Sequence, residues 1–317
     1  MNGGPGCSSL AGFTTEHSPF LLQPDGKTLK SNAYAWNRVA NMIYLESPVG
    51  VGFSFSDNPN ADYKEFNDDR TAQDVYQAMV SFFAKFPQYR RNEFYVSGES
   101  YAGHYVPVST YHIHMGNLAR VNPTINLKGF IVGNGVTDGR EDVNSIPPFM
   151  YQHALISQSN HEEARTICGG DYYKNQNDPK CSQALDNMFV TIAGINPYWL
   201  TGPCEGEPSP FKSSPSLMRQ VLSRRNLTDA QSVHPLFEMW RMGGKKGALS
   251  LLASPSNGGV PCIDDTPVLN YFNTPEVKKA IHAKQNIEWQ FCNFEINRKY
   301  NRSYDSMLPF YAKLLNA

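Results

Sequence analysis

The sequence predicts an α/β fold in which a parallel sheet carries an inserted helical subdomain. Between residues 42 and 133, short apolar runs that favour strands alternate with segments of helical periodicity, which is the pattern of a parallel sheet covered by helices. From about residue 138 to residue 260 this alternation stops, and helical stretches separated by Pro and Gly replace it. We therefore assign residues 1–137 to a core, residues 138–260 to an insertion and residues 261–317 to a return to the core.

The first half of the core should begin with a hairpin and continue as strand, helix, strand, helix and strand. Residues 21–37 are rich in turn-forming residues and predict the hairpin. Met42–Leu45 is a continuous apolar run that predicts a buried strand. Residues 67–86 predict an amphipathic helix that Asn67 caps and Pro87 ends. A strand over residues 94–97, a helix over about 102–118 and a strand over 127–132 should follow.

The second half of the chain should be mainly helical. Within the insertion, we expect helices over about residues 146–167, 182–193 and 214–223. After it, residues 274–283 predict a helix with Thr274 at the N-cap and Pro275 at the first helical position, where its missing N–H costs nothing. Sheet elements should resume only near the carboxyl end.

A serine stands at the turn between the strand and the helix in the middle of the core. Residues 94–103 read Phe-Tyr-Val-Ser-Gly-Glu-Ser-Tyr-Ala-Gly. A nucleophilic serine at such a turn needs small neighbours, because the backbone is strained and passes close to itself. Gly98 and Ala102 are small enough, although the usual pattern has Gly at the second position. The alternative interpretation of Ser100 is a serine in an ordinary Gly-rich turn.

The first ten residues form a second motif, Met-Asn-Gly-Gly-Pro-Gly-Cys-Ser-Ser-Leu. Three Gly and one Pro within four positions leave several backbone N–H groups free to point the same way. This composition is typical of an oxyanion hole or of another anion-binding loop. The alternative is a tight turn without a binding function.

Composition excludes several classes of function. A net charge of −1 gives no electrostatic reason to bind nucleic acid or an anionic membrane. The sequence contains no apolar run long enough to span a bilayer. The six Cys form no Cys-x-x-Cys pair and the eight His are scattered, so we expect no metal site and no cofactor. An even number of Cys favours disulfides, with 15 pairings that the sequence alone does not distinguish.

Together the two motifs make the chain similar to the serine carboxypeptidases, of the lysosomal cathepsin A type. Further segments resemble that family in the family's own order, including Asn32–Asn37, Leu45–Ser54, Val132–Gly135, Cys262 and Trp289–Phe294. The resemblance covers nearly the whole chain. It implies an α/β-hydrolase fold with a helical cap subdomain inserted after the nucleophile-bearing half of the sheet.

The resemblance implies a serine carboxypeptidase that removes C-terminal residues from peptides at acidic pH through an acyl-enzyme. Ser100 would be the nucleophile, and the backbone N–H groups of Gly4 and Tyr101 would form the oxyanion hole. The terminal carboxylate of the substrate would bind to groups at four positions, namely Asn2, Gly3, Glu16 and Glu99. By itself, Glu16 reads as a solvated surface charge, and its distance of nine residues from Cys7 within the motif favours the functional role.

Two other functions are compatible with the same scaffold. One is an acyltransferase, as some plant relatives are, which keeps the same catalytic residues. The other is a non-catalytic relative that binds or stabilises a partner. The resemblance also allows a homodimer and lysosomal glycosidase partners.

The resemblance further selects the disulfide pairing Cys7–Cys292, Cys168–Cys181 and Cys204–Cys262. Two sequons, at Asn226 and Asn301, agree with a secretory route to the lysosome or vacuole, or out of the cell. The sequence has no signal peptide, and Met1 falls inside a family motif. We therefore expect the chain to be the central portion of a longer protein.

The catalytic base is the part of the site that the sequence does not supply. In the family, the triad Asp lies shortly beyond the Trp-x-x-Cys-Asn-Phe segment and the His follows it. No Asp or His of this chain matches those positions. His104 lies one helical turn after Ser100, and we expect the helix to carry it away from the nucleophile. His112 and His114 should point to different faces of the same helix, and Asp264 and Asp265 have no triad context.

Overall fold

The computed structural model describes residues 1–120, 122–192, 195–202 and 264–316. The chain divides into two compact units. Unit 1 contains residues 1–138 and 266–317, and unit 2 contains residues 139–265. The expected helix at 214–223, the pair Cys204–Cys262 and the sequon at Asn226 lie outside the described residues.

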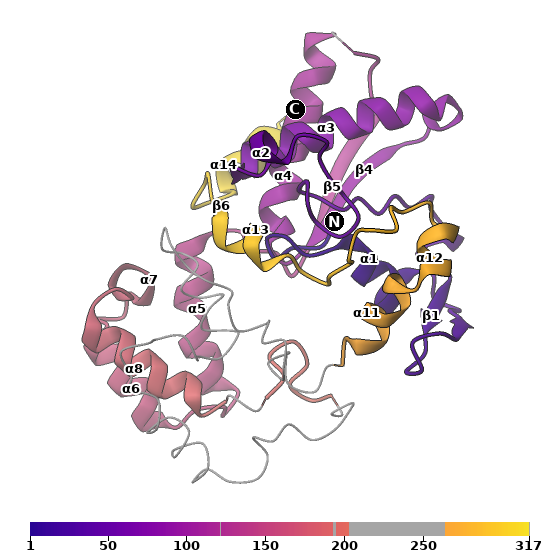
Figure 1. Cartoon of the computed structure of the whole chain (residues 1–317). Helices are drawn as coiled ribbons and strands as arrows, with labels where there is room; N and C mark the ends of the chain where they lie inside the picture. The colour runs from indigo at the N-terminus through magenta and orange to yellow at the C-terminus, as the bar shows by residue number, and fades with distance from the viewer. Residues whose placement is uncertain (121, 193–194, 203–263, 317) are drawn as a thin grey trace. The chain divides into compact units, whose positions relative to one another are not determined.

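The centre of unit 1 is a parallel pair of strands packed against two long helices (Figure 1). Strand β4 (Phe94–Glu99) pairs with β5 (Leu127–Gly133), from Phe94 opposite Leu127 to Glu99 opposite Gly133. Helices α3 (Asp68–Lys85) and α4 (Ala102–Ala119) pack on each other and bury an apolar cluster with β4. Most of this cluster comes from the two helices and the N-cap of α4: Met79, Phe83, Tyr101, Ala102, Tyr105, Val106 and Ile113.

Several predictions for unit 1 are confirmed. The hairpin consists of β1 (Phe20–Leu22) and β2 (Leu29–Ser31), which pair antiparallel. Asn67 caps α3, since its side chain accepts a hydrogen bond from the Arg70 N–H at 2.8 Å. Helix α12 (Pro275–Ala280) has Thr274 at its N-cap and Pro275 in its first turn, although the Thr274 side chain makes no capping hydrogen bond.

The remaining elements of unit 1 are short. The Gly-rich segment leads into α1 (Ser9–Gly12) and a π-helical turn over Phe13–His17. Two 3₁₀ turns cover Trp36–Arg38 and Pro87–Tyr89. Strand β3 (Phe66–Asn67) pairs in parallel with β6 (Tyr300–Asn301), so a sheet element does return near the carboxyl end. The other helices are α2 (Pro59–Asp62), α11 (Thr266–Asn273), α13 (Phe294–Lys299) and α14 (Leu308–Leu315).

In its described part, unit 2 is helical. It contains α5 (Gly139–Gln152), α6 (Gln158–Ile167), α7 (Tyr172–Asn175) and α8 (Pro179–Val190). These helices bury their own apolar cluster, centred on Met150, Leu185, Met188 and Phe189. A disulfide joins Cys168 to Cys181 within it.

Two predictions of regular structure were wrong. The single helix expected over 146–167 is broken between Gln152 and Gln158, where Ala154 has a φ of 55° and Ser157 caps the next helix. Met42–Leu45 forms no strand. A strand needs a hydrogen-bonded neighbour, and in the described part of the chain no strand lies beside this apolar run; Ile43 stays 38% exposed.

In the described ranges, none of the helices combines the length and the apolar character that crossing a membrane would need.

Candidate active site

Ser100 lies at the sharp turn between β4 and α4. Its φ is 61°, a left-handed conformation that costs a non-Gly residue about 1–3 kcal/mol unless neighbouring contacts hold it. Two backbone hydrogen bonds do so: the Ser100 N–H donates to the Gly133 carbonyl at 3.2 Å, and the Val136 N–H donates to the Ser100 carbonyl at 2.9 Å. The turn is therefore anchored on the carboxyl end of β5, and it presents the serine beyond the end of β4.

The small residues around Ser100 are required by the packing. A Cβ placed on Gly98 would lie 2.5 Å from the Ala102 Cβ, and one on Gly103 would lie 2.3 Å from the Val136 carbonyl oxygen. No real side chain tolerates such distances. The sequence predicted that Gly98 and Ala102 must be small. The structure adds Gly103, which lies against the backbone of Val136.

The Gly-rich loop lies directly against the serine turn. A Cβ on Gly3 would lie 2.2 Å from the Tyr101 nitrogen and 2.8 Å from the Ser100 Cβ. Gly4 follows with a φ of 113°, a conformation that L-residues avoid. Tyr101 is the N-cap of α4, where backbone N–H groups have no acceptor within the helix. Gly4 and Tyr101, the two predicted oxyanion donors, thus come from segments that are in contact.

Four contacts fix the Gly-rich loop in position. Cys7 forms a disulfide with Cys292 across a separation of 285 residues. The Gly6 N–H donates to the buried Tyr105 hydroxyl at 3.2 Å, and the Asn293 N–H donates to the Gly6 carbonyl at 2.8 Å. The Asn297 side chain donates to the Pro5 carbonyl at 2.9 Å. The segment that contains Cys292, Asn293 and Asn297, together with α4, therefore holds the loop in place.

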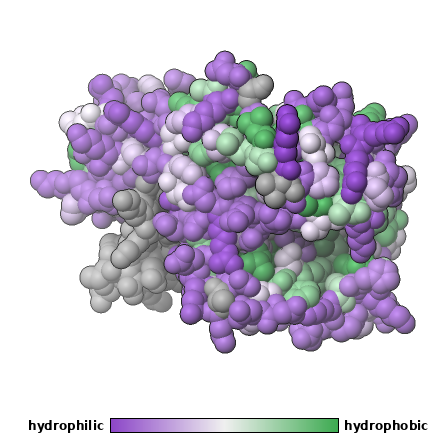
Figure 2. Space-filling model, turned by 90° about the horizontal axis from the view of Figure 1, so that it is seen from above, coloured by the Kyte–Doolittle hydropathy of each residue, from purple (hydrophilic) through white to green (hydrophobic). Residues whose placement is uncertain are grey.

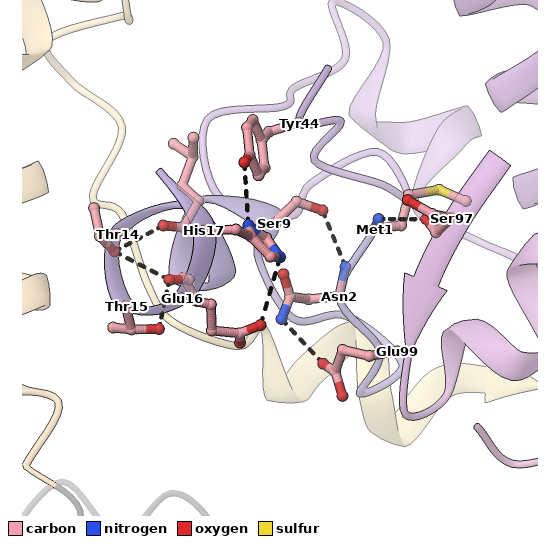
Figure 3. Close-up of polar contacts among 12 residues, drawn as sticks. Met1, Asn2, Ser9, Thr14, Thr15, Glu16, His17, Tyr44, Ser97 and Glu99 are labelled. Atoms are coloured by element: carbon pink, nitrogen blue, oxygen red, sulfur yellow. Dashed lines mark hydrogen bonds and ion pairs between the residues drawn. The ribbon is translucent and has the colours of Figure 1, made fainter. Parts of the chain in front are cut away.

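Asn2, Glu16 and Glu99 form a polar cluster beside the loop. The Asn2 side-chain amide donates a hydrogen bond to the Glu99 carboxylate at 3.0 Å. Asn2 and Glu16 both lie next to Gly12. A Cβ on Gly12 would be 2.9 Å from Asn2 Oδ1 and 3.4 Å from Glu16 Oε1. Figure 3 shows these three side chains turned toward the same space. Gly12 therefore leaves the room that the cluster occupies.

The pKa values of both carboxyl groups in the cluster are raised. Burial raises the pKa of Glu99, and the charge of Glu16 raises it further, against hydrogen bonds from Asn2 and from the Gly3 N–H. Burial likewise raises the pKa of Glu16, against the positive charge of the Met1 amino group. Because each protonated carboxyl becomes a hydrogen-bond donor, the cluster gains donors as the pH falls.

The structure adds residues that sequence reasoning missed. His17 Nε2 lies 3.5 Å from the Glu16 carboxylate, and His17 Nδ1 lies 3.1 Å from the Tyr44 hydroxyl (Figure 3). The half-buried Glu46 accepts hydrogen bonds from Ser8 and Trp289 and links the start of the chain to the Trp289 segment. The motifs that carry the family resemblance include Glu46 and Trp289, and this was the only signal available for them.

Among the described residues, the Ser100 hydroxyl has no hydrogen bond to a histidine or a carboxylate. His104 is 2% exposed and stacks on the Tyr101 ring, with Nδ1 3.8 Å from the Asp68 carboxylate. His104 is therefore a packing residue rather than a partner of Ser100. His112 lies 4.0 Å from Asp69 on the surface of α3 and α4.

The other predicted positions lie as follows. Both disulfides that fall within the described residues, Cys7–Cys292 and Cys168–Cys181, have the predicted pairing. The sequon residue Asn301 is exposed in β6. In the ranges that the structure covers, no three His, Cys, Asp or Glu side chains gather as metal ligands would.

The chain matches the family model described as serine carboxypeptidase over residues 1–317. It is 38% identical to serine carboxypeptidase-like 21 of Arabidopsis thaliana, covering 99% of this chain and 66% of the relative. It is also 38% identical to the lysosomal protective protein of Mus musculus, covering 100% and 64%. Among solved structures, the prohormone-processing carboxypeptidase Kex1 from Saccharomyces cerevisiae aligns with a TM-score of 0.67 at 22% identity, covering 99% of this chain and 62% of that one.

These comparisons confirm the predicted α/β-hydrolase fold. The chain spans slightly less than two thirds of the length of the curated relatives it matches.

Proposed function

This chain belongs to the serine carboxypeptidase family, and from that membership we propose that it is the part of a serine carboxypeptidase that binds the peptide C-terminus and supplies the nucleophile. The substrate is a peptide or protein with a free terminal carboxylate, and the reaction passes through an acyl-enzyme on Ser100.

The observation that carries the proposal is the carboxyl cluster directly beside the serine turn. Glu99 immediately precedes Ser100, Asn2 is hydrogen-bonded to Glu99, and Gly3 packs against the Ser100 Cβ. A terminal carboxylate bound by this cluster would bring the last peptide bond close to Ser100. An endopeptidase has no use for such a cluster, whereas an exopeptidase requires it.

The raised pKa values of Glu16 and Glu99 explain how two carboxyl groups bind a third. At acidic pH each protonated carboxyl donates a hydrogen bond to the substrate carboxylate, together with the Asn2 amide and the Gly3 N–H. As the pH rises through their pKa values, the same groups ionise and repel it. The proposal therefore predicts that peptide binding weakens as the pH rises.

The chemistry assigned to the turn follows from its backbone. Ser100 attacks the carbonyl carbon of the last peptide bond, and the N–H groups of Gly4 and Tyr101 stabilise the oxyanion. Loss of one such donor costs about 2.7–4 kcal/mol of transition-state stabilisation in comparable enzymes. The base that accepts the serine proton is a histidine outside the described residues.

The experiment separates binding from turnover. A blocked dipeptide with a free C-terminus and the same dipeptide as its C-terminal amide are titrated into the chain at pH 5 by calorimetry. We expect the free acid to bind and the amide to bind much more weakly. Hydrolysis of the free acid, measured in the longest natural form of the protein and abolished by Ser100→Ala, tests the reaction itself. Equal affinity for acid and amide would refute the proposed carboxylate site.

We further propose that the protein works in the lysosome, in a vacuole or outside the cell. The Cys7–Cys292 and Cys168–Cys181 disulfides persist in such oxidising compartments, and the exposed Asn301 is accessible to glycosylation. Association with a second copy or with a lysosomal glycosidase stays a prediction from the family resemblance.

A further inference from the structure

Asp68 is a buried carboxylate that the proposed hydrolysis does not use directly. It is the first residue of α3. Hydrophilic residues cover most of the face seen from above (Figure 2), whereas Asp68 has no exposed surface. Burying a charged carboxylate is costly unless hydrogen bonds or an opposite charge compensate it. The partners of Asp68 therefore indicate what this carboxylate does in the fold.

Three hydrogen bonds compensate the charge of Asp68. The Tyr101 hydroxyl donates to Oδ1 at 2.9 Å, and the Tyr300 hydroxyl donates to the same oxygen at 3.2 Å. The Ser303 N–H donates to Oδ2 at 2.8 Å. The N-terminal end of α3 also favours a negative charge at this position. Burial raises the pKa of Tyr101, and the charge of Asp68 raises it further, so the Tyr101 hydroxyl keeps its proton and remains a donor.

Tyr101 connects this carboxylate to the oxyanion hole. It follows Ser100 directly, and its backbone N–H is one of the two proposed oxyanion donors. Its side chain is 2% exposed and lies flat against the His104 ring, with the ring centroids 4.9 Å apart and an interplanar angle of 11°. Because the ring is held on its face and at its hydroxyl, it keeps one orientation. The backbone that carries this ring is restrained with it.

The same group of aromatic rings reaches the Gly-rich loop. The Tyr105 hydroxyl accepts a hydrogen bond from the Gly6 N–H at 3.2 Å. The Tyr105 ring packs against Tyr101 and Tyr300, with ring centroids 5.2 and 5.9 Å apart, and the Tyr101 and Tyr300 centroids are 5.5 Å apart. Asp68 accepts hydrogen bonds from two of these three rings. The serine turn and the Gly-rich loop therefore contact one aromatic cluster that Asp68 holds together.

We propose that Asp68 is a positioning residue for the oxyanion hole. By accepting the hydrogen bonds of Tyr101 and Tyr300, it fixes the aromatic cluster on which the Tyr101 backbone N–H and the Gly-rich loop are aligned. Asp68 neither touches the substrate nor transfers a proton, and it acts through Tyr101. This inference rests on the proposed function, because the oxyanion hole has a task only if Ser100 attacks a peptide bond.

Two pairs of variants test the proposal. Tyr101→Phe deletes one hydroxyl and leaves the ring and the backbone N–H of residue 101 in place. Tyr304→Phe is its matched control, because the Tyr304 hydroxyl donates at 2.6 Å to Asp69, which lies in the same first turn of α3 but outside the aromatic cluster. Asp68→Asn and Asp69→Asn form the second pair, with the same change of charge at adjacent positions. If Asp68→Asn does not fold, Tyr101→Phe decides alone.

Turnover of the blocked dipeptide is measured at pH 5 in the longest natural form of the protein, at a temperature well below Tm. Removing an oxyanion donor altogether lowers kcat by about 10²- to 10³-fold, and a displaced donor keeps part of its effect, so Tyr101→Phe and Asp68→Asn should lower kcat by about tenfold or more. KM should change by less than about twofold, because the lost interaction is made only in the transition state. The two control variants should keep the kcat of the parent.

Amide hydrogen exchange in residues 1–317 gives a readout that needs no peptidase activity. The Gly6 N–H is hydrogen-bonded to Tyr105, and its exchange reports how firmly the aromatic cluster holds the Gly-rich loop. Asp68→Asn should speed exchange at Gly6 by about tenfold, the factor that corresponds to one hydrogen bond of ordinary strength. Asp69→Asn should leave exchange at Gly6 unchanged.

Three outcomes would overturn the proposal. If Tyr101→Phe and Asp68→Asn lower Tm but keep the kcat of their controls, the role of Asp68 is purely structural. A raised KM with unchanged kcat would assign Tyr101 to substrate binding instead. Equal exchange at Gly6 in Asp68→Asn and Asp69→Asn would show that Asp68 does not hold the loop. Failure of the proposed function looks different: the parent protein then shows no hydrolysis that Ser100→Ala abolishes, while exchange at Gly6 still accepts or rejects the role of Asp68.

Discussion

Replacing Gly3 by Ala should disturb both stability and the binding site, because Gly3 is the point where the Gly-rich loop touches the serine turn. The new Cβ would lie 2.2 Å from the Tyr101 nitrogen, 2.8 Å from the Ser100 Cβ and 2.9 Å from the Glu99 carbonyl oxygen. Real Cβ atoms come no closer than about 3.0 Å to such atoms, so the loop must retreat by roughly 0.8 Å. Two of these atoms belong to the backbone and the third is a Cβ, so none of them can move aside by a change of rotamer.

The expected cost follows from this displacement. Overpacking a tight contact costs about 1–3 kcal/mol of unfolding free energy, which corresponds to roughly 2–4 °C in Tm for every kcal/mol in a chain of 150–250 residues. The hydrogen bond from the Gly3 N–H to Glu99 would also be lost or lengthened. A misplacement of about 1 Å at a catalytic group reduces turnover by about a hundredfold.

Gly129→Ala is the matched control. Gly129 lies in β5, has no left-handed φ, and a Cβ there would meet only the Tyr95 ring at an ordinary 3.5 Å. Differential scanning calorimetry gives Tm for the two variants, and calorimetric titration with the blocked dipeptide at pH 5 gives affinity. Gly3→Ala should lower both, whereas Gly129→Ala should change neither appreciably. If Gly3→Ala is as stable as the control and binds the dipeptide equally well, the contact between the loop and the serine turn does not define the site.

Three further predictions concern the cross-links, the pH response and turnover. Cys7→Ser should reduce the unfolding free energy by about 2–3 kcal/mol more than Cys181→Ser does on the chain-entropy model. The reason is that the Cys7–Cys292 disulfide closes a loop of 285 residues, whereas Cys168–Cys181 closes one of 13. Equal Tm losses in the two variants would contradict this. Glu99→Gln should keep dipeptide affinity at higher pH than the parent chain and should raise stability at neutral pH more than at acidic pH. The reason is that a carboxyl whose pKa is raised on folding contributes stability that is lost as the pH rises through the folded pKa. Unchanged pH profiles of affinity and Tm would remove Glu99 from the carboxylate site. Residues 1–317 alone should bind the blocked dipeptide without hydrolysing it, because Ser100 has no histidine partner in the described structure. If the chain hydrolyses the dipeptide at pH 5 and Ser100→Ala abolishes this activity, the chain contains its own base.

Local sequence determined the elements of the core because their signals are local. The helix that begins after Asn67 was predictable from a capping residue and from apolar positions three or four apart. The turn at Ser100 was predictable from Gly98 and Ala102, since only small residues fit beside a strained backbone. The family motifs predicted the members of the candidate site, and the two observed disulfides have the predicted partners.

The tertiary structure decided what depends on neighbours distant in sequence. Met42–Leu45 has the composition of a strand but forms none, because a strand exists only where another strand offers hydrogen bonds. The raised pKa of Glu99 arises from burial and from Glu16, 83 positions away in the printed sequence. The contact of Gly3 with Tyr101 joins two loops that composition describes only separately. Burial, electrostatic coupling and strand pairing are properties of the folded arrangement, so no reading of one segment at a time could have supplied them.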